Sequence, residues 1–309
     1  MINQKTNQIA KKLEYRPIKG LDVNRPYVLL AKKKNRQFVI KTDHFEDEAA
    51  ILKILNQDDY FSKHHIIIPN LYEYSDQFLV QDFIKGRMIN INSRNFSHNL
   101  QMISNKLEFI HSGLNRKKKI GNLSKGWNDQ FAKMPFQNSV WLKKRITRWF
   151  EDKQSKPKYR FTNVQNSQVM KLILKIKDQN MINFGAFSPA HIRIQNEKIG
   201  LFDFGHHIRW APKQYDLAYL WWGLLFEIEH KRNEPEFWFK LAKDLTKSIP
   251  ISERSQYWAC ILERLAGLSK DLTLSSHNQI PRWHKMILKI KNQLTPMAIS
   301  ELQKLLSNG

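Results

Sequence analysis

The side chains best suited to chemistry fall in two parts of the chain. In the first part, Lys41 ends the apolar run Val39-Ile40-Lys41, and Glu48 follows in a segment whose apolar residues have helical spacing. A lysine at the end of a strand can hold nucleotide phosphates, and a glutamate on the neighbouring helix can hold that lysine in place. A lysine in such a position is also a common solvated edge residue. The pair alone therefore suggests a phosphate site without establishing one.

The second group follows in the later half of the chain. Its three pieces are the loop NFGAFSPAHI (residues 183–192), the run LFDFG (201–205) and the run QYDLA (214–218). Asp203 and Asp216 supply its carboxylates. A loop, a short hairpin and two aspartate-bearing runs in this order form a pattern that chance rarely produces.

The elements that must position these residues change in kind along the chain. The first quarter reads as short β-rich runs around one helix, and the remainder is mostly helical. The predicted strands are 26–31, 37–41, 70–74 and 78–84, with a helix over 45–55 and a strand pair within 192–203 that turns at Asn196. Later helices include 100–110, 169–176 and a stretch from about Tyr215 to the end, where Thr295-Pro296 is expected to start the last helix. This order predicts an α+β fold of two lobes with a ligand cleft between them.

The pattern resembles the aminoglycoside phosphotransferases, choline kinases and related small-molecule kinases, which are cousins of protein kinases. In that family the loop commonly reads His-Gly-Asp-Phe-Ser-Pro-x-Asn-Ile-Leu. The likeness covers roughly residues 13–270, and the loop positions kept here are Gly185, Phe187, Ser188, Pro189 and Ile192.

The resemblance implies a protein-kinase-like arrangement of two domains. Residues 1–84 form a small β-rich N-lobe of the nucleotide-binding type, and residues 85–309 form a larger helical C-lobe. The C-lobe contains the catalytic-loop-like segment 183–205 and a basic helical insert over 116–160.

The resemblance also implies a role for individual residues. Lys41 would hold phosphate with Glu48 as its partner, and Asp82 and Phe83 in the hinge strand would contact the nucleotide. Asp203 would bind the metal. Gly185 and Asp216 would be structural, the aspartate tying down the loop. The implied cofactors are ATP and Mg²⁺ or Mn²⁺.

Three loop positions depart from the family pattern. Phe184 replaces the loop histidine, Ala186 replaces the catalytic aspartate, and His191 replaces the metal-binding asparagine. A methyl group can neither orient an acceptor hydroxyl nor take its proton. We therefore expect a pseudokinase-like protein with no intact catalytic residue. Either His206 or His207 could replace the lost base, or both could be structural.

His191 has two interpretations. As a metal ligand beside Asp203 it would suit Mn²⁺ or Zn²⁺ better than Mg²⁺, because imidazole is a poor magnesium ligand. Otherwise it packs in a loop that no longer catalyses.

The insert over 116–160 holds fourteen basic and three acidic residues, a net charge of +11. Its candidate anion-binding residues are Lys143, Lys144, Arg145 and Arg148. Interleaved tryptophans suit phosphates and stacked bases, or an acidic membrane face. The alternative is a solvated helix surface with tryptophans facing the core. The sign of the charge argues against cationic aminoglycosides as substrates.

The whole chain carries a net charge of +23, which indicates an anionic partner or a lysine-rich composition without functional meaning. The only cysteine, Cys260, cannot form an internal disulfide, so a reducing compartment is expected. The N-terminus lacks a signal-like apolar run, and the longest apolar run, 217–228, is too short to cross a bilayer. A cytoplasmic protein without a transmembrane segment is therefore predicted.

Three functions stay open at this point. The chain is a degenerate kinase-fold protein that binds a nucleotide or another anionic small molecule, an active ATP-dependent phosphotransferase on an unknown small molecule or sugar, or a binder of nucleic acid or an acidic surface on a kinase scaffold. Ala186 distinguishes the first from the second, and the charge of the insert supports the third.

Overall fold

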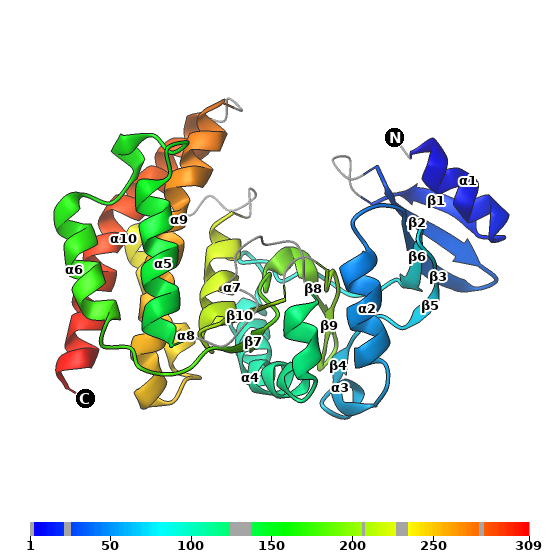
Figure 1. The fold of residues 1–309 in the computed structure, drawn as a ribbon, viewed down its shortest axis with the longest axis horizontal. Helices are drawn as coiled ribbons and strands as arrows, with labels where there is room; N and C mark the ends of the chain where they lie inside the picture. Colours follow the sequence, from blue (N-terminus) through cyan, green and yellow to red (C-terminus); the bar gives the residue numbers. More distant parts are fainter. Residues whose placement is uncertain are drawn as a thin grey trace.

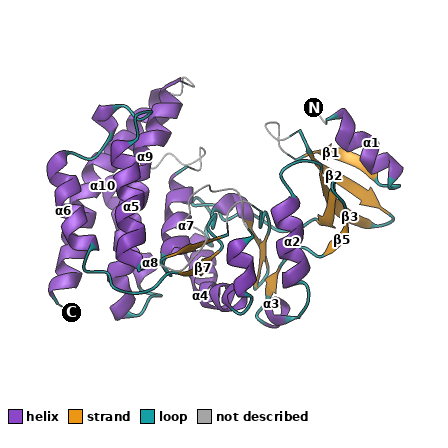
Figure 2. Cartoon of the chain, viewed as in Figure 1, coloured by secondary structure: helices purple, strands orange, loops and turns teal. Residues whose placement is uncertain are grey.

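A computed structural model of the chain describes residues 3–21, 26–123, 137–205, 208–226, 234–277 and 281–308. Figure 1 shows a small lobe at the N-terminal end, a central region of helices and short strands, and a group of long helices at the far end. Figure 2 shows that the strands gather in the first two regions. The predicted two-lobed α+β fold is confirmed.

The N-lobe is built on a five-stranded antiparallel sheet with strand order β1-β2-β3-β6-β5. The β2–β3 hairpin predicted from the sequence pairs Val28 with Lys41, so Lys41 ends a central strand. The first helix and first strand were not predicted. The elements of this lobe are α1 (Gln4–Lys12), β1 (Arg16–Gly20), β2 (Val28–Lys33), β3 (Arg36–Lys41), α2 (Glu46–Leu55), α3 (Tyr60–Lys63), β4 (Ile66–Ile67), β5 (Leu71–Tyr74) and β6 (Leu79–Asp82).

The C-lobe combines long helices with two small strand groups. The predicted hairpin is present as β8 and β9, it turns at Asn196 with a positive φ of 54°, and β4 adds to it in parallel. Two three-residue strands, β7 and β10, pair antiparallel and were not predicted. The elements of the lobe are α4 (Phe96–Asn115), α5 (Asn138–Glu151), α6 (Asn163–Ile173), β7 (Met181–Asn183), β8 (Ile192–Gln195), β9 (Lys198–Leu201), β10 (Arg209–Ala211), α7 (Tyr215–Leu225), α8 (Pro235–Thr246), α9 (Arg254–His277) and α10 (Pro281–Ser307), with short 3₁₀ turns at Lys118–Asn122, Pro157–Tyr159, Pro189–His191 and Ile251–Glu253.

One predicted helix start is wrong. Thr295-Pro296 lies inside α10 and does not begin it. A proline inside a helix cannot donate the backbone hydrogen bond to the carbonyl four residues earlier. The Thr295 hydroxyl instead donates to the carbonyl oxygen of Lys291 at 2.7 Å, and apolar packing of Leu294 and Ala298 keeps both sides of the interruption in place.

One large apolar core joins the two lobes. It fills the C-lobe and continues into the inner face of α2 through Ile51, Leu52 and Leu55. The β-sheet has a smaller core of its own. Since α2 also carries Glu48, the main core fixes the position of this glutamate. Over the described ranges of the chain, no helix is long and apolar enough to cross a membrane.

Candidate functional site

Lys41 lies at the end of β3 and is the centre of a buried ionic group. Its Nζ donates to Glu48 Oε2 at 2.5 Å and to Asp203 Oδ1 at 2.9 Å. Glu48 is fully buried and also accepts from Gln81 Nε2 at 3.1 Å. The structure thus brings together a strand, a helix and a loop that are far apart in sequence.

The electrostatics of this group keep its charges in place. Burial alone would lower the pKa of Lys41, because desolvation disfavours the ammonium. The neighbouring carboxylates of Glu48 and Asp203 outweigh burial and raise the pKa of Lys41 well above its ordinary value. Lys41 is therefore a permanent cation at any physiological pH.

Asp203 follows β9 and faces both Lys41 and His191. Its Oδ2 lies 3.3 Å from His191 Nε2, while His191 Nδ1 lies 2.9 Å from the carbonyl oxygen of Ala186. A carbonyl oxygen only accepts, so the hydrogen-bond network assigns the Nδ1 proton to this bond. The imidazole thus links position 186 to Asp203, and its Nε2 is directed at the carboxylate.

Lys41, His191 and Asp203 line a cleft of about 380 Å³ between the lobes. This volume is in the usual range for small-molecule sites. Asp82 and Phe83 also line the cleft. The Asp82 carboxylate bonds Asn70 and Arg36, so it is engaged on the N-lobe side. The further lining residues include Leu21, Val28, Val39, Ile84, Met88, Arg193 and Phe202.

The Asp216 carboxylate fixes the backbone of the loop that precedes β8 through two hydrogen bonds. One carboxylate oxygen accepts from Phe184 N at 2.8 Å, and the other accepts from Gly185 N at 2.7 Å. His111 Nε2 lies 2.9 Å from the same carboxylate, and all of these groups are buried. Gly185 has a φ of +80°, a conformation that costs an L-residue free energy. The loop is therefore a rigid support for position 186.

Aromatic side chains pack against one another around the loop that contains Ala186. The Phe184 ring makes edge-to-face contacts with Phe204 at 5.1 Å and with Phe187 at 6.2 Å. Ala186 is fully buried beside them. Of the described residues that line the cleft, only Asp82 and Asp203 carry carboxylates, and each already has a cationic partner. His206 and His207 lie outside the described residues.

Solved structures share the fold of this chain. An aminoglycoside phosphotransferase from Alicyclobacillus acidocaldarius superposes with a TM-score of 0.55 at 11% identity, covering 95% of this chain and 93% of the other. Choline kinase LicA from Streptococcus pneumoniae gives 0.54 at 14% identity, with 96% and 97% covered. Amicoumacin kinase hAmiN, in complex with AMP-PNP, Ca²⁺ and Ami, gives 0.54 at 12% identity, with 91% and 92% covered.

The chain has the aminoglycoside phosphotransferase and choline kinase fold. Identities this low establish the fold and leave the activity to be argued from the site. No protein-family model matches the chain, and no curated protein sequence matches it.

Two side chains of the cleft were not singled out from the sequence. Gln81 on β6 donates to Glu48, and Arg193 on β8 stacks its guanidinium over the Phe202 ring at 4.7 Å. Burial lowers the pKa of Arg193. Each contact depends on tertiary packing, Gln81 with Glu48 on α2 and Arg193 with Phe202 after β9, and no local pattern in the sequence signals either contact.

The candidate anion-binding residues on α5 separate into two groups. Lys143, Lys144 and Arg148 are exposed, as a binding surface requires. The prediction that Arg145 binds an external anion is not supported. Arg145 is buried and donates from Nε to Glu263 Oε1 at 3.0 Å, so it belongs to the core of the helical bundle. The middle of the insert, residues 124–136, lies outside the described residues.

Proposed function

We propose that this chain is a kinase-fold protein of the aminoglycoside-phosphotransferase type that binds a nucleotide with a divalent cation but transfers phosphate poorly or not at all. The observation that carries the proposal is a contrast between two neighbouring parts of the site. The buried ionic group of Lys41, Glu48 and Asp203 is formed, while the side chain at position 186 is a buried methyl group.

The nucleotide side of the proposal rests on the buried lysine. An ammonium held by two carboxylates is rigid, and in this geometry it can neutralise phosphate oxygens entering the cleft. Apolar residues on both walls, among them Val28, Ile84 and Phe202, offer a surface for a nucleobase. The structural neighbour hAmiN holds AMP-PNP and Ca²⁺, which is consistent with this use of the fold.

The residues present also fit a divalent cation. His191 Nε2 and Asp203 Oδ2 are 3.3 Å apart, a separation that suits two adjacent ligands of one ion with bonds of about 2.1 Å. Among the described residues no group of three or more His, Cys, Asp or Glu side chains could hold a metal alone. The nucleotide phosphates would therefore complete the coordination, as is usual for Mg²⁺ and Mn²⁺. A bound cation would supply charge neutralisation at the phosphates.

Among the described residues of the cleft, no carboxylate is left for an acceptor hydroxyl, and the Nε2 of His191 is the atom that this proposal assigns to the cation. The two carboxylates of the described cleft are bonded to cations, and His191 uses Nδ1 to donate to the Ala186 carbonyl. General-base assistance contributes about 10²–10⁴-fold to a rate. Its loss would leave binding intact while slowing transfer by such a factor.

Isothermal titration calorimetry with ATP in the presence of Mg²⁺, and separately of Mn²⁺, tests the binding half of this proposal. We expect saturable binding in the parent and a loss of at least tenfold in Lys41→Met, because the variant removes the phosphate cation. Lys32→Met removes an exposed cation from the adjacent strand and serves as the matched control. Absence of heat and of any thermal shift at millimolar ATP would refute nucleotide binding.

A further inference from the structure

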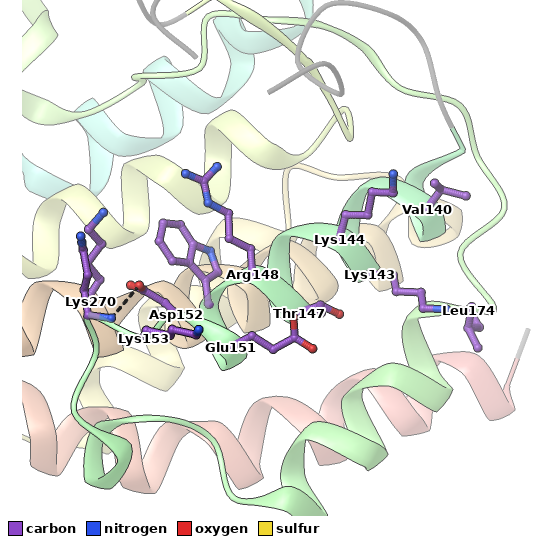
Figure 3. Close-up of a pocket in the computed structure, with 12 residues that line it drawn as sticks. Val140, Lys143, Lys144, Thr147, Arg148, Glu151, Asp152, Lys153, Leu174 and Lys270 are labelled. Carbon is purple, nitrogen blue, oxygen red and sulfur yellow. Dashed lines mark hydrogen bonds between the residues drawn. The ribbon is translucent and has the colours of Figure 1, made fainter. Parts of the chain in front are cut away.

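The cleft between the lobes contains a cation to which the proposed nucleotide site assigns no role. Arg193 lines this cleft together with Lys41. Cations also line a groove of about 1110 Å³ along α5, but Figure 3 shows Glu151 and Asp152 among the lysines there. The surroundings of Arg193 differ, because within the described ranges of the chain no carboxylate forms an ion pair with it.

The β8–β9 hairpin turns the Arg193 side chain toward the cleft. Arg193 pairs across the hairpin with Gly200, which has no side chain of its own. Ile84, from the segment that connects the lobes, packs directly against Gly200 and leaves no room for a Cβ there. Phe202, just after β9, lines the cleft beside Arg193 and Ile84. Arg193 is thus part of the cleft wall that the C-lobe supplies.

Hydrogen bonds and stacking hold the guanidinium of Arg193 in place. Its Nη1 donates to the carbonyl oxygens of Ala190 at 3.1 Å and Ile192 at 2.9 Å. The guanidinium carbon lies 4.7 Å from the centre of the Phe202 ring, and His191 contacts the same ring edge-on at 6.1 Å. The guanidinium therefore lies in the same part of the cleft as the imidazole that is assigned to the divalent cation.

The charge of Arg193 is not neutralised by its surroundings. Burial lowers its pKa, and no neighbouring carboxylate opposes this effect. Lys41 shows the reverse balance, because Glu48 and Asp203 raise its pKa. An arginine in a protein nevertheless stays protonated. The site therefore contains a partly desolvated positive charge whose counterion is not a carboxylate of the described chain.

The free side of the guanidinium has the shape of a phosphate site. Nη1 is occupied by the two carbonyl oxygens, whereas Nε and Nη2 of Arg193 form no hydrogen bond within the described chain and are not fully buried. These two nitrogens point their N–H groups in parallel, which matches two oxygens of one phosphate. A nucleobase offers uncharged acceptors to such a fork, so a phosphate is the better partner.

We propose that Arg193 is a second phosphate-binding residue of the cleft, so that Lys41 from the N-lobe and Arg193 from the C-lobe hold one ligand between them. This inference rests on the proposed nucleotide site and adds the ligand class, a chain of two or more phosphates. Two separate cations on the walls of one cleft suit such a chain, because its charged oxygens are spread along its length.

Isothermal titration calorimetry with ATP and with inorganic tripolyphosphate, each in the presence of Mg²⁺, tests this role. The variant Arg193→Gln removes the charge and keeps an amide that can donate to a backbone carbonyl. We expect it to bind both probes at least tenfold more weakly than the parent, because charge-assisted hydrogen bonds to phosphate are lost. Arg193→Lys keeps the charge without the planar fork, so its affinities should lie between those of the parent and Arg193→Gln.

Arg87→Gln is the matched control. The Arg87 backbone bridges to Ile194 beside Arg193, but its side chain is exposed and does not line the cleft. The control therefore removes the same charge from the same neighbourhood and should keep the affinities of the parent. Thermal melting should show each variant folded. Should Arg193→Gln melt lower than the parent, Arg193→Met, which retains an apolar contact with Phe202, repeats the measurement.

The outcomes separate this inference from the proposed function. A parent that does not bind ATP would refute the nucleotide site, and the role of Arg193 with it. If the parent binds ATP, parent-like affinities in Arg193→Gln, or equal losses in Arg193→Gln and Arg87→Gln, would overturn the role of Arg193 alone. A loss confined to ATP would place Arg193 against the nucleoside, and a parent that binds ATP but not tripolyphosphate would show that the phosphates contribute little; either result overturns it as well.

Discussion

The methyl group of Ala186 lies within a loop whose backbone is otherwise fully supported. Gly185 before it is bonded to Asp216, and the carbonyl oxygen of Ala186 itself accepts from His191. A side chain at this position would start from a fixed backbone, next to the residue that faces Asp203. An aspartate introduced at position 186 would therefore extend from a backbone that these hydrogen bonds hold in place.

The variant Ala186→Asp should raise ATP hydrolysis, or transfer to an alcohol, by about 10²–10⁴-fold over the parent. The reason is that an aspartate at 186 could accept a proton on the acceptor side of the cleft. Ala186→Asn has the same shape without a base and should stay near the parent rate. Measurement of ADP release with Mg²⁺ and with Mn²⁺ decides. Equal gains in both variants, or no gain while nucleotide still binds, would contradict the role given to position 186.

Asp216 supports the loop through both carboxylate oxygens, so Asp216→Asn should be costly. An amide nitrogen would face a backbone N–H donor, which leaves buried groups unsatisfied. We expect the free energy of unfolding to fall by about 2–4 kcal/mol in urea denaturation. Asp59→Asn, which breaks an exposed pair with Lys63 at 2.9 Å, should cost less than about 0.5 kcal/mol. Similar losses in the two variants would argue against a supporting role for Asp216.

The sequence identified some residues of the cleft but not the contacts that they make. Lys41, Glu48 and Asp203 could be named because they stand in segments that resemble motifs of the small-molecule kinases, and the structure brings the three together. The contact of His191 with the Ala186 carbonyl depends on how the loop folds back on itself. Arg145 was misplaced because its partner, Glu263, lies 118 residues further along the chain.

At the scale of elements, short β-rich runs and helices with an apolar stripe were predicted well. The β2–β3 and β8–β9 hairpins and the helix α2 all lie where the pattern indicates. The three-residue strands β7 and β10 are too short to show alternation, so only their tertiary pairing defines them. The helix α10 continues through a proline because packing on both sides outweighs the local signal.

Helix α10 also buries a cation. Lys291 is 2% exposed, its Nζ donates to the carbonyl oxygen of Tyr159 at 2.5 Å, and it lies over the Phe161 ring. Burial lowers the pKa of Lys291 from 10.5 to about 8. The unfolded chain therefore binds a proton between pH 8 and 10.5 that the folded chain has released, so the free energy of unfolding rises with pH across this window.

Lys291→Met should remove this pH dependence and stabilise the protein at pH 7, where the buried ammonium costs about 3 kcal/mol. Lost hydrogen bonding to Tyr159 will offset part of that gain. Lys289→Met changes an exposed lysine of the same helix and should leave both stability and its pH profile unchanged. Urea denaturation from pH 7 to 10 provides the measurement. A parent whose stability stays flat over this range would rule out a perturbed Lys291.

At the scale of the whole molecule, 51 basic residues oppose 28 acidic ones. Their excess lies almost entirely in residues 85–309, where 38 basic residues oppose 17 acidic ones, whereas residues 1–84 hold 13 basic and 11 acidic residues. Self-repulsion of this kind destabilises a compact state, and salt screens it over a distance of about 10 Å at 0.1 M. Surface ion pairs respond in the opposite direction, because screening weakens their attraction.

The net charge of +23 decides between these two effects. We expect the melting temperature to rise between about 0.02 and 0.3 M NaCl, a range in which screening is strong. The α5 variant Lys143→Gln/Lys144→Gln/Arg148→Gln should melt higher than the parent at low salt and gain less from added salt, because it lowers the net positive charge of the molecule. The N-lobe control Lys12→Gln/Lys32→Gln/Lys34→Gln removes the same charge from a less crowded surface, so its salt response should stay closer to that of the parent. A melting temperature that falls with salt would mean that paired surface charges, and not the excess of cations, govern the stability of this protein.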